Sequence, residues 1–198
     1  MPIREDREYR VMVQELRKIQ DEESRYIVEG YATTFDDPYL LYDDGEYKLF
    51  EQVDRHAFDK TDMKDVIFQY DHEGMVYARN KNKTLDLSID DHGLKVRADL
   101  SKTQASRDMY EAISTGLVDQ MSFAFKVRKD SFDKEKSLRT ILDISRLYDV
   151  SAVSIPANPG TNISARSYCD GVIAELRAER LAKELEVKRQ QIKIELEV

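Results

Sequence analysis

The chain has little of what marks a secreted or membrane-spanning protein. It contains one cysteine in 198 residues, so it cannot form an internal disulfide and carries no sign of an oxidising compartment. No run approaches the roughly 20 apolar residues of a membrane span, and the first ten residues, MPIREDREYR, lack the apolar core of a secretory signal. We therefore expect a cytoplasmic protein or one that belongs to an intracellular particle.

Basic charge is also in short supply. The 39 Asp and Glu residues outnumber the 31 Lys and Arg residues, which gives a net charge of -8. Nonspecific binding to nucleic acid needs a basic surface, so we expect no nucleic-acid partner. Charged residues make up 35% of the chain, against about 25% in average domains. This excess predicts that part of the chain is solvated surface or extended helix.

Several catalytic motifs are absent. The chain has no GxSxG, which argues against an α/β-hydrolase, and no P-loop, GxGxxG or HExxH. Two acidic clusters that contain histidine, Asp71–Glu73 and Asp90–His92, could be considered as metal sites. Adjacent residues point in different directions, however, and turn tips are usually solvated. We therefore expect neither a metal nor a cofactor.

Composition divides the chain into three regions. Residues 1–41 resemble a β-hairpin of Tyr9–Arg17 and Arg25–Phe35, because both stretches are rich in β-forming residues. Residues 42–167 read as mainly β with short helices. We take 1–167 as one domain and 168–198 as a charged C-terminal helix.

The middle region contains recognisable elements. The pattern predicts strands at Val66–Tyr70 and Ser122–Arg128, a hairpin of Leu85–Ile89 and Leu94–Leu100, a helix at Thr103–Thr115, a charged mobile loop at 129–139 and an apolar strand within Thr140–Ile155. The two prolines and the glycine that follow this last strand predict an irregular turn.

The C-terminal region is a helix with a narrow, imperfect apolar stripe. Its apolar positions include Ile173, Leu176, Leu181, Leu185 and Ile192. It is either a solvated terminal helix or a helix that docks on a scaffold or another subunit. Cys169 lies at its edge without an activating neighbour and reads as an incidental thiol.

Three histidines limit the choice of a general base. His56 lies in a polar turn and His92 at a hairpin tip, where solvation explains both. His72 follows the apolar run VIFQY and so projects from the end of a rigid strand, a position that suits a catalytic group. Its acidic neighbours Asp71 and Glu73 favour the imidazolium that a base must become. Placement alone favours a structural role for His72 over a catalytic one.

Two further residues are candidates for nucleophilic chemistry. Ser122 shares a strand face with Ala124, whose small side chain leaves room for a substrate carbonyl. Asp149 interrupts the apolar run LYDVSAVSI, where an unpaired carboxylate is costly. It either forms an ion pair with Arg139 or Arg146, or orients the histidine. A surface hydroxyl remains the plain alternative for Ser122.

The order of these motifs resembles a known family. EGYATTF, HAFDKTD, FQYDHEGMVYAR, GLVDQMSFAF and LYDVSAVSIPANPG follow one another as in the prohead proteases of HK97-type tailed phages, over about residues 9–165. The Met-Ser-Phe-Gly/Ala-Phe segment of that family matches Met121–Phe125. Its Glu-Val-Ser segment matches Asp149–Ser151, with aspartate in place of the more common glutamate.

The resemblance implies a fold and a mechanism. The fold would be an α+β, mainly β structure like that of herpesvirus assembly proteases, a β-barrel surrounded by short helices. Ser122 would attack the scissile carbonyl, His72 would act as base and Asp149 as the third member. Backbone N–H groups of Ala157 and Asn158 would form the oxyanion hole. Arg79 would support the histidine segment through an ion pair.

The implied role is maturation of a bacteriophage procapsid. The protease would enter the procapsid in the host cytoplasm, cleave the scaffolding segment of the major capsid protein, and digest itself. A homodimer is possible, and the terminal helix becomes a docking handle or removable tail. The alternatives are a noncatalytic assembly or scaffolding protein on the same fold and a metal-dependent hydrolase.

Overall fold

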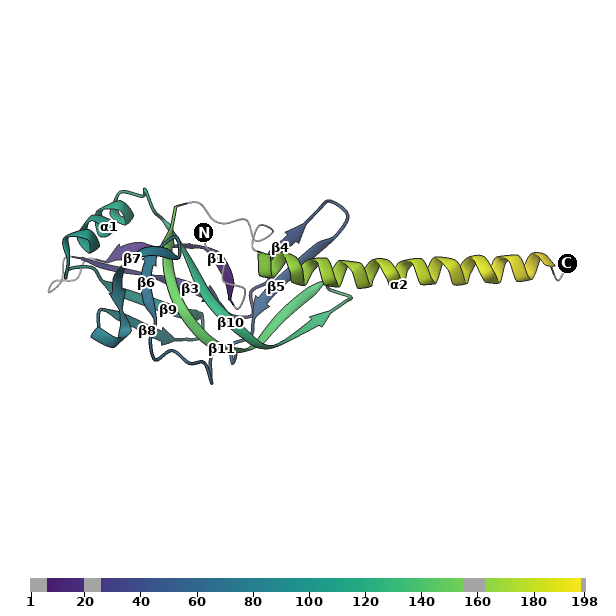
Figure 1. Cartoon of the computed structure of the whole chain (residues 1–198), viewed down its shortest axis with the longest axis horizontal. Helices are drawn as coiled ribbons and strands as arrows, with labels where there is room; N and C mark the ends of the chain where they lie inside the picture. Colours follow the sequence, from purple (N-terminus) through teal and green to yellow (C-terminus); the bar gives the residue numbers. More distant parts are fainter. Residues whose placement is uncertain (1–6, 20–25, 155–162, 197–198) are drawn as a thin grey trace.

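The computed structural model describes residues 7–19, 26–154 and 163–196. These residues form two β-sheets, one short helix and one long helix (Figure 1). The elements in chain order are β1 (Glu8–Glu15), β2 (Arg17–Ile19), β3 (Ile27–Thr34), β4 (Tyr39–Asp43), β5 (Lys48–Val53), β6 (Ile67–Tyr70), β7 (Glu73–Arg79), the 3₁₀ turn η1 (Asn80–Asn82), β8 (Leu85–Ile89), β9 (Gly93–Asp99), α1 (Gln104–Ser114), β10 (Gln120–Asp133), β11 (Leu138–Val153) and α2 (Ile163–Leu196). The predicted α+β, mainly β class is confirmed.

The larger sheet is built around the long strands β10 and β11. Its order is β1-β10-β11-β5-β4, and β6 also pairs with β11 and carries β7 on its other side. One edge of β11 has room for two parallel neighbours because residues 138–141 pair with β5 and residues 149–152 pair with β6. The C-terminal half of β11 therefore lies between β10 and β6.

The smaller sheet has the order β2-β3-β9-β8. Only Leu16 separates β1 from β2, so the chain passes from one sheet to the other at this buried residue. The predicted hairpin of the first region is therefore only partly right. Residues 17–19 pair with β3, whereas β1 pairs with β10. Alternation of apolar and polar residues predicts a strand but does not choose its partner.

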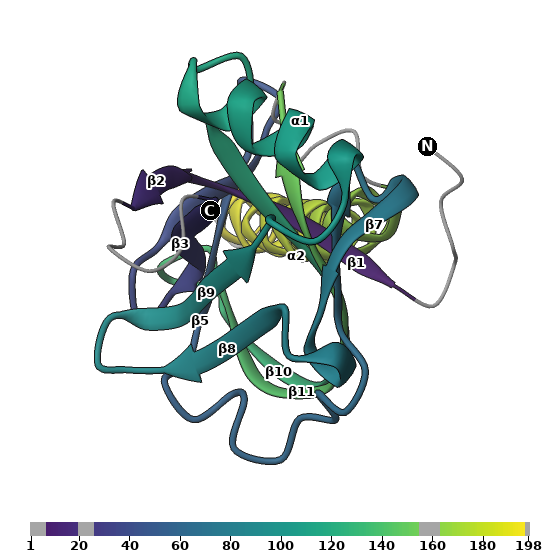
Figure 2. The same ribbon diagram turned by 90° about the vertical axis from the view of Figure 1, so that its left-hand side faces the viewer.

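The strand pairings among the described residues do not close into a barrel, in contrast to the barrel that the resemblance implied. β4, β7 and β8 each pair with a single strand and so end their sheets. In Figure 2 the two sheets face each other, with α1 lying across one end. The main core fills the space between them and includes the stacked rings of Phe123 and Phe125.

Two predicted elements of the middle region form as expected. The hairpin is β8 and β9, paired from Leu85 to Ile89. α1 starts after Thr103, whose side chain accepts a hydrogen bond from the backbone N–H of Ser106. It buries Met109 and Ile113 and is followed by Gly116 at φ 75°, a left-handed conformation that suits glycine.

The predicted mobile loop at 129–139 is wrong. β10 and β11 remain paired as far as Asp133 and Leu138, which leaves residues 134–137 as the turn. The charge of this segment suggested a solvated loop. Arg139 is instead buried and forms ion pairs with Glu8 of β1 and Glu51 of β5. Ion pairs distant in sequence thus keep a charged segment in the sheet.

The long helix α2 is anchored only at its start. Cys169 and Ile173 are buried in a small second core with Leu41 and Leu49. Burial raises the pKa of the Cys169 thiol to about 11, so it stays protonated at neutral pH. From Leu181 to Ile194 the side chains of the helix are exposed, and the helix extends away from the sheets (Figure 1). None of the helices in the described ranges is long and apolar enough to cross a membrane.

Candidate active site

His72 occupies a tight two-residue hairpin turn between β6 and β7. Asp71 and His72 both have positive φ angles, 48° and 60°, which is typical of the turn that matches the twist of two antiparallel strands. The Asp71 N–H donates to the carbonyl oxygen of Ala152 and so fixes the turn on β11. Left-handed backbone is uncommon outside glycine and clusters at functional sites. This turn directs the imidazole back over the sheet.

Ser122 lies in the middle of β10, opposite Val11 of β1 and Ser151 of β11. Its side chain is fully buried. The oxygen Oγ lies 2.6 Å from Nε2 of His72. The serine is therefore held on a strand with neighbours on both sides, and it points at the histidine turn.

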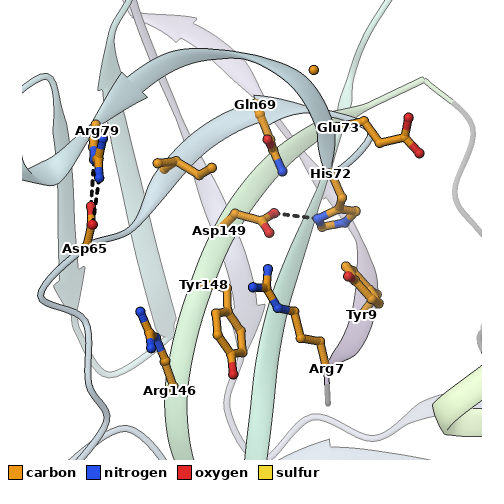
Figure 3. A pocket seen from close by; sticks show the side chains of 12 residues that line it. Arg7, Tyr9, Asp65, Gln69, His72, Glu73, Arg79, Arg146, Tyr148 and Asp149 are labelled. Carbon is orange, nitrogen blue, oxygen red and sulfur yellow. Dashed lines mark hydrogen bonds and ion pairs between the residues drawn. The ribbon is translucent and has the colours of Figure 1, made fainter. Parts of the chain in front are cut away.

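Asp149 lies on β11, diagonal to Ser122 and level with Ile67 of β6. Its Oδ1 is 2.5 Å from Nδ1 of His72, and the side chains of both residues are nearly inaccessible, at 3% and 2% exposure (Figure 3). Of the alternatives left open by the sequence, Asp149 therefore pairs with the histidine. The shorter side chain of aspartate reaches the imidazole because β11 and β6 are direct neighbours.

These three side chains form one continuous hydrogen-bonded chain. With Nδ1–H donating to Asp149, the neutral imidazole presents Nε2 as an acceptor for the Ser122 hydroxyl. The carboxylate fixes the ring and stabilises the imidazolium that forms when Nε2 takes the proton. The arrangement is able to activate a serine for attack on a carbonyl carbon.

Ser151 completes the site and was not among the predicted residues. Its hydroxyl donates to Oδ1 of Asp149 over 2.9 Å and lies 3.2 Å from Nδ1 of His72. It is fully buried. Its position two residues after Asp149 places it on the same strand face, and this spacing was the signal in the sequence. Ser151 holds the carboxylate and the ring together.

Strand β1 covers the site from the other side. The ring of Tyr9 packs edge-on against the imidazole of His72, with 4.8 Å between ring centres. The Ser122 hydroxyl also lies 2.9 Å from the backbone carbonyl oxygen of Arg10, an acceptor that competes with Nε2 of His72 for the single hydroxyl proton. No local pattern connects β1 with the nucleophile, because this contact spans 112 residues.

The other predicted site residues are placed differently. Arg79 forms a two-pronged ion pair with Asp65, at 2.6 and 2.7 Å, and lies across the pocket from the histidine (Figure 3). The ion pair holds the end of β7, the strand that follows the histidine turn, and Asp65 lies outside that turn. Ala157 and Asn158, the candidates for the oxyanion hole, lie outside the described residues.

The two remaining histidines lie apart from this site. His56 is within 3.3 Å of Asp59, and its side chain is 72% exposed. His92 packs against the ring of Tyr31 at a hairpin tip. Within the described ranges, no group of three His, Cys, Asp or Glu side chains is arranged to hold a metal ion.

A cavity of about 470 Å³ opens beside His72 and Asp149. Figure 3 shows that its walls come from β1, the β6–β7 hairpin and β11. The charged and aromatic side chains around it include Arg7, Arg146 and Tyr148, with the Arg7 guanidinium 3.7 Å from the centre of the Tyr148 ring. The cavity gives an extended ligand a place next to the base.

Comparison with known proteins agrees with this site. Residues 13–171 match the caudovirus prohead serine protease family. The chain belongs to this family. It is also 28% identical over 147 residues to the prohead protease of Enterobacteria phage HK97, an alignment that covers 74% of this chain and 62% of that protein. The chain thus spans less than two thirds of that relative's length, and no solved structure is significantly similar to it.

The range that matches the family contains the residues of the candidate active site. The matched range of the prohead serine protease family contains Ser122, His72, Asp149 and Ser151, the four side chains that the structure brings together. It begins at residue 13, however, so the part of β1 that covers Ser122 lies outside it.

Proposed function

We propose that this chain is a serine endopeptidase that cleaves the scaffolding segment of the major capsid protein during maturation of a phage procapsid. The observation that carries the proposal is His72, which lies between Ser122 and Asp149 at 2.6 and 2.5 Å. The family match and the similarity to a phage prohead protease supply the biological setting.

The mechanism follows from these contacts. Nε2 of His72 removes the Ser122 proton as Oγ attacks the scissile carbonyl carbon, and Asp149 stabilises the resulting imidazolium. The imidazolium then protonates the leaving amine, which releases one fragment and leaves an acyl-enzyme. Water, deprotonated by the same histidine, hydrolyses the acyl-enzyme and restores Ser122. Backbone N–H groups of Ala157 and Asn158 remain our candidates for binding the oxyanion.

Coexpression with the cognate major capsid protein tests the function. The wild-type chain should shorten the capsid protein, whereas Ser122→Ala and His72→Ala should leave it at full length. His92→Ala is the matched control, because His92 is an exposed histidine far from the site, and it should behave like wild type. Shortening that persists in both active-site variants would leave a noncatalytic assembly or scaffolding role, and inhibition by chelators would favour a metal-dependent hydrolase.

The same reaction would remove parts of the chain itself. We place self-cleavage near residues 129–139 or in α2, because residues 134–136 and Leu181–Ile194 are exposed. Mass spectrometry of purified wild-type protein should show fragments that Ser122→Ala protein lacks. Identical fragment patterns would contradict self-cleavage.

The setting is the inside of the procapsid in the host cytoplasm, with the capsid protein and its scaffolding segment as partners. We assign residues 1–167 to the protease domain and the charged helix from 168 onward to docking or to a removable tail. A homodimer is compatible with this role. The two facing sheets support the inference that the fold is an open counterpart of the herpesvirus assembly-protease barrel.

A further inference from the structure

The candidate nucleophile is sealed from solvent. Ser122 has no exposed surface, and only 2% of the His72 side chain is exposed. A serine peptidase must bring Oγ into contact with the carbonyl carbon of its substrate. A substrate therefore reaches Ser122 only after a covering segment has moved.

The N-terminal half of β1, Glu8–Met12, is that covering segment. It pairs antiparallel with β10, so that Val11 lies opposite Ser122. The Ser122 hydroxyl is 2.9 Å from the backbone carbonyl oxygen of Arg10. A nucleophile in a peptidase lies similarly close to the substrate backbone, but it must face the carbonyl carbon, whereas here the hydroxyl faces the oxygen. The strand therefore resembles a bound peptide held in an unreactive position.

The position of β1 in the sheet makes it replaceable. It is the outermost strand on its side of the larger sheet, with β10 as its partner in the ladder. Exposed sheet edges bind extended peptides by adding a strand, with backbone hydrogen bonds supplying affinity. If Glu8–Met12 leaves, the edge of β10 beside Ser122 is free for such a peptide. The family match starts at residue 13, so Glu8–Met12 lies outside the matched range.

A charged socket on the opposite face of the sheet fixes this segment. The Arg10 side chain is 1% exposed and pairs with Glu51, which is fully buried and also accepts a 2.8 Å hydrogen bond from Arg139. Burial by itself lowers the pKa of Arg10, but the charges of Glu51 and Glu8 and the hydrogen bond to Glu51 together more than offset it and raise the pKa well above its ordinary value. Arg10 therefore stays positively charged in this socket, where it contacts two carboxylates.

The charged side chains that remain after Glu8–Met12 has left determine which peptide binds best in its place. Glu8 and Arg10 leave together and carry no net charge. Glu51 and Asp130 remain with Arg139, a net charge of -1 in a largely buried site. Glu51 keeps Arg139 but loses Arg10, and removing one partner of a buried ionic group is strongly destabilising. A peptide that brings its own positive side chain therefore binds best.

We propose that Glu8–Met12 occupies the edge of β10 where the substrate strand binds, and that the incoming strand places a lysine or arginine side chain in the Glu51 socket. This rests on the proposed peptidase function and specifies its substrate. The chain is latent while β1 is docked, and the preferred substrate is an extended peptide with a basic residue at the position of Arg10.

A reversible tether tests whether β1 must leave. Tyr9 and Ala124 are direct partners across the strand pair, so Tyr9→Cys with Ala124→Cys allows a disulfide between them. The readout is labelling of Ser122 by a fluorophosphonate, compared in the same full-length protein with the disulfide oxidised and reduced. We expect labelling to be at least 100-fold slower in the oxidised form. Equal rates in the two forms would overturn the proposal.

Peptide binding tests the socket without any need for catalysis. Labelled peptides with the sequence of Glu8–Leu16, EYRVMVQEL, and with Lys, Gln or Glu at its third position are titrated into full-length Ser122→Ala protein. We expect the Arg and Lys peptides to bind at least tenfold more tightly than the Gln peptide, and the Glu peptide least. Glu51→Gln should remove this preference, whereas Glu46→Gln, at an exposed acid, should keep it. Equal affinities for the four peptides would overturn the basic preference.

These results separate the two proposals. If the wild-type chain never shortens the capsid protein, the proposed function fails, yet the peptides still report whether the β10 edge selects a basic residue. If the capsid protein is cut by Ser122 while tethered and free forms label equally, the function stands and the docking proposal fails.

Discussion

Asp149 and Ser151 project from one face of β11 toward the same imidazole nitrogen, and this small cluster decides how His72 behaves. Asp149 is 2.5 Å from Nδ1, and Ser151 donates to the same carboxylate oxygen. The carboxylate holds the tautomer in which Nε2 is free to accept the Ser122 proton. Substitution of either Asp149 or Ser151 should therefore lower kcat, and the loss should be larger at Asp149.

Asp149→Asn should preserve the fold and nearly abolish turnover. The amide is close in size to the carboxylate but favours the wrong tautomer of His72 and gives no charge to the imidazolium, which costs on the order of 10,000-fold in kcat in a serine triad. Steady-state cleavage of a capsid-derived peptide measures this loss. A decrease of less than about tenfold would show that Asp149 is not the orienting group.

Ser151→Ala should be milder. The variant loses one hydrogen bond to Asp149, so we expect a decrease in kcat of about tenfold, since a hydrogen bond to a charged group is worth roughly 1.5–3 kcal/mol. KM should stay unchanged. Ser145→Ala, at a partly buried serine whose hydroxyl donates to the carbonyl oxygen of Lys126, is the control and should keep the wild-type kcat. An unchanged kcat in Ser151→Ala would show that Ser151 does not position the His72–Asp149 pair.

At this scale the sequence predicted much of the candidate site. Ser122, His72 and Asp149 were identified by their motifs, and the structure brings them together. Tyr9 and the carbonyl of Arg10 could not be found, because they reach the site through a strand pairing that local pattern does not encode. Arg79 was expected to support the histidine segment through an ion pair; it pairs with Asp65, a partner that the sequence analysis did not name.

At the scale of single elements, α2 combines an anchored start with an unsupported end. Cys169 and Ile173 are buried, and Lys134 and Glu46 pair with Glu179 and Arg180 along the next turns. Exposed ion pairs of this kind contribute little. Beyond them, from Leu181 to Ile194, the side chains of α2 are exposed, so the helical hydrogen bonds of this stretch have no tertiary support.

Hydrogen exchange should reveal this gradient. We expect amides around residues 168–173 to exchange with the slow rates of the folded body, and amides beyond residue 181 to exchange at least 100-fold faster, because they open locally. Exchange mass spectrometry on the full chain measures both regions in one experiment. Uniform protection along α2 would mean that the distal part is covered, for example by a second copy of the chain.

Elements that depend on neighbouring residues in the sequence were predicted well, whereas elements that depend on contacts with distant strands were not. The β8–β9 hairpin and α1 depend on turn residues and on a cap at Thr103, which the sequence displays. The segment 129–139 was taken for a loop because its charges have no local partners. Its pairing depends on Arg139 reaching Glu51 of β5 and Glu8 of β1.

At the scale of the whole molecule, one buried ionic network joins three strands of the larger sheet. Arg10, Glu51 and Arg139 come from β1, β5 and β11, and Glu8 pairs with both arginines. Burial by itself raises the pKa of the Glu8 carboxyl, but the two arginines more than offset it and lower the pKa from 4.5 to about 2. Glu8 therefore stabilises the fold only while it is ionised.

The free energy of unfolding should consequently fall in acid. The contribution of Glu8 is complete above pH 4.5 and is lost as the pH falls toward 2, and it amounts to on the order of 3 kcal/mol. Urea unfolding of wild type and Glu8→Gln should differ most at pH 7 and converge near pH 2. Glu46→Gln, at an exposed acid, should show little difference at any pH. A difference between wild type and Glu8→Gln that stays constant with pH would contradict this account.

The projecting helix also governs how a single copy of the chain moves through solution. Thirty-four residues of helix extend about 51 Å, and most of that length drags through solvent while adding little mass. The frictional coefficient is therefore that of a larger sphere, and a monomer will elute early from a size-exclusion column, where it can be mistaken for a dimer. Sedimentation equilibrium or light scattering, which weigh the particle independently of its shape, are the measurements that count its subunits.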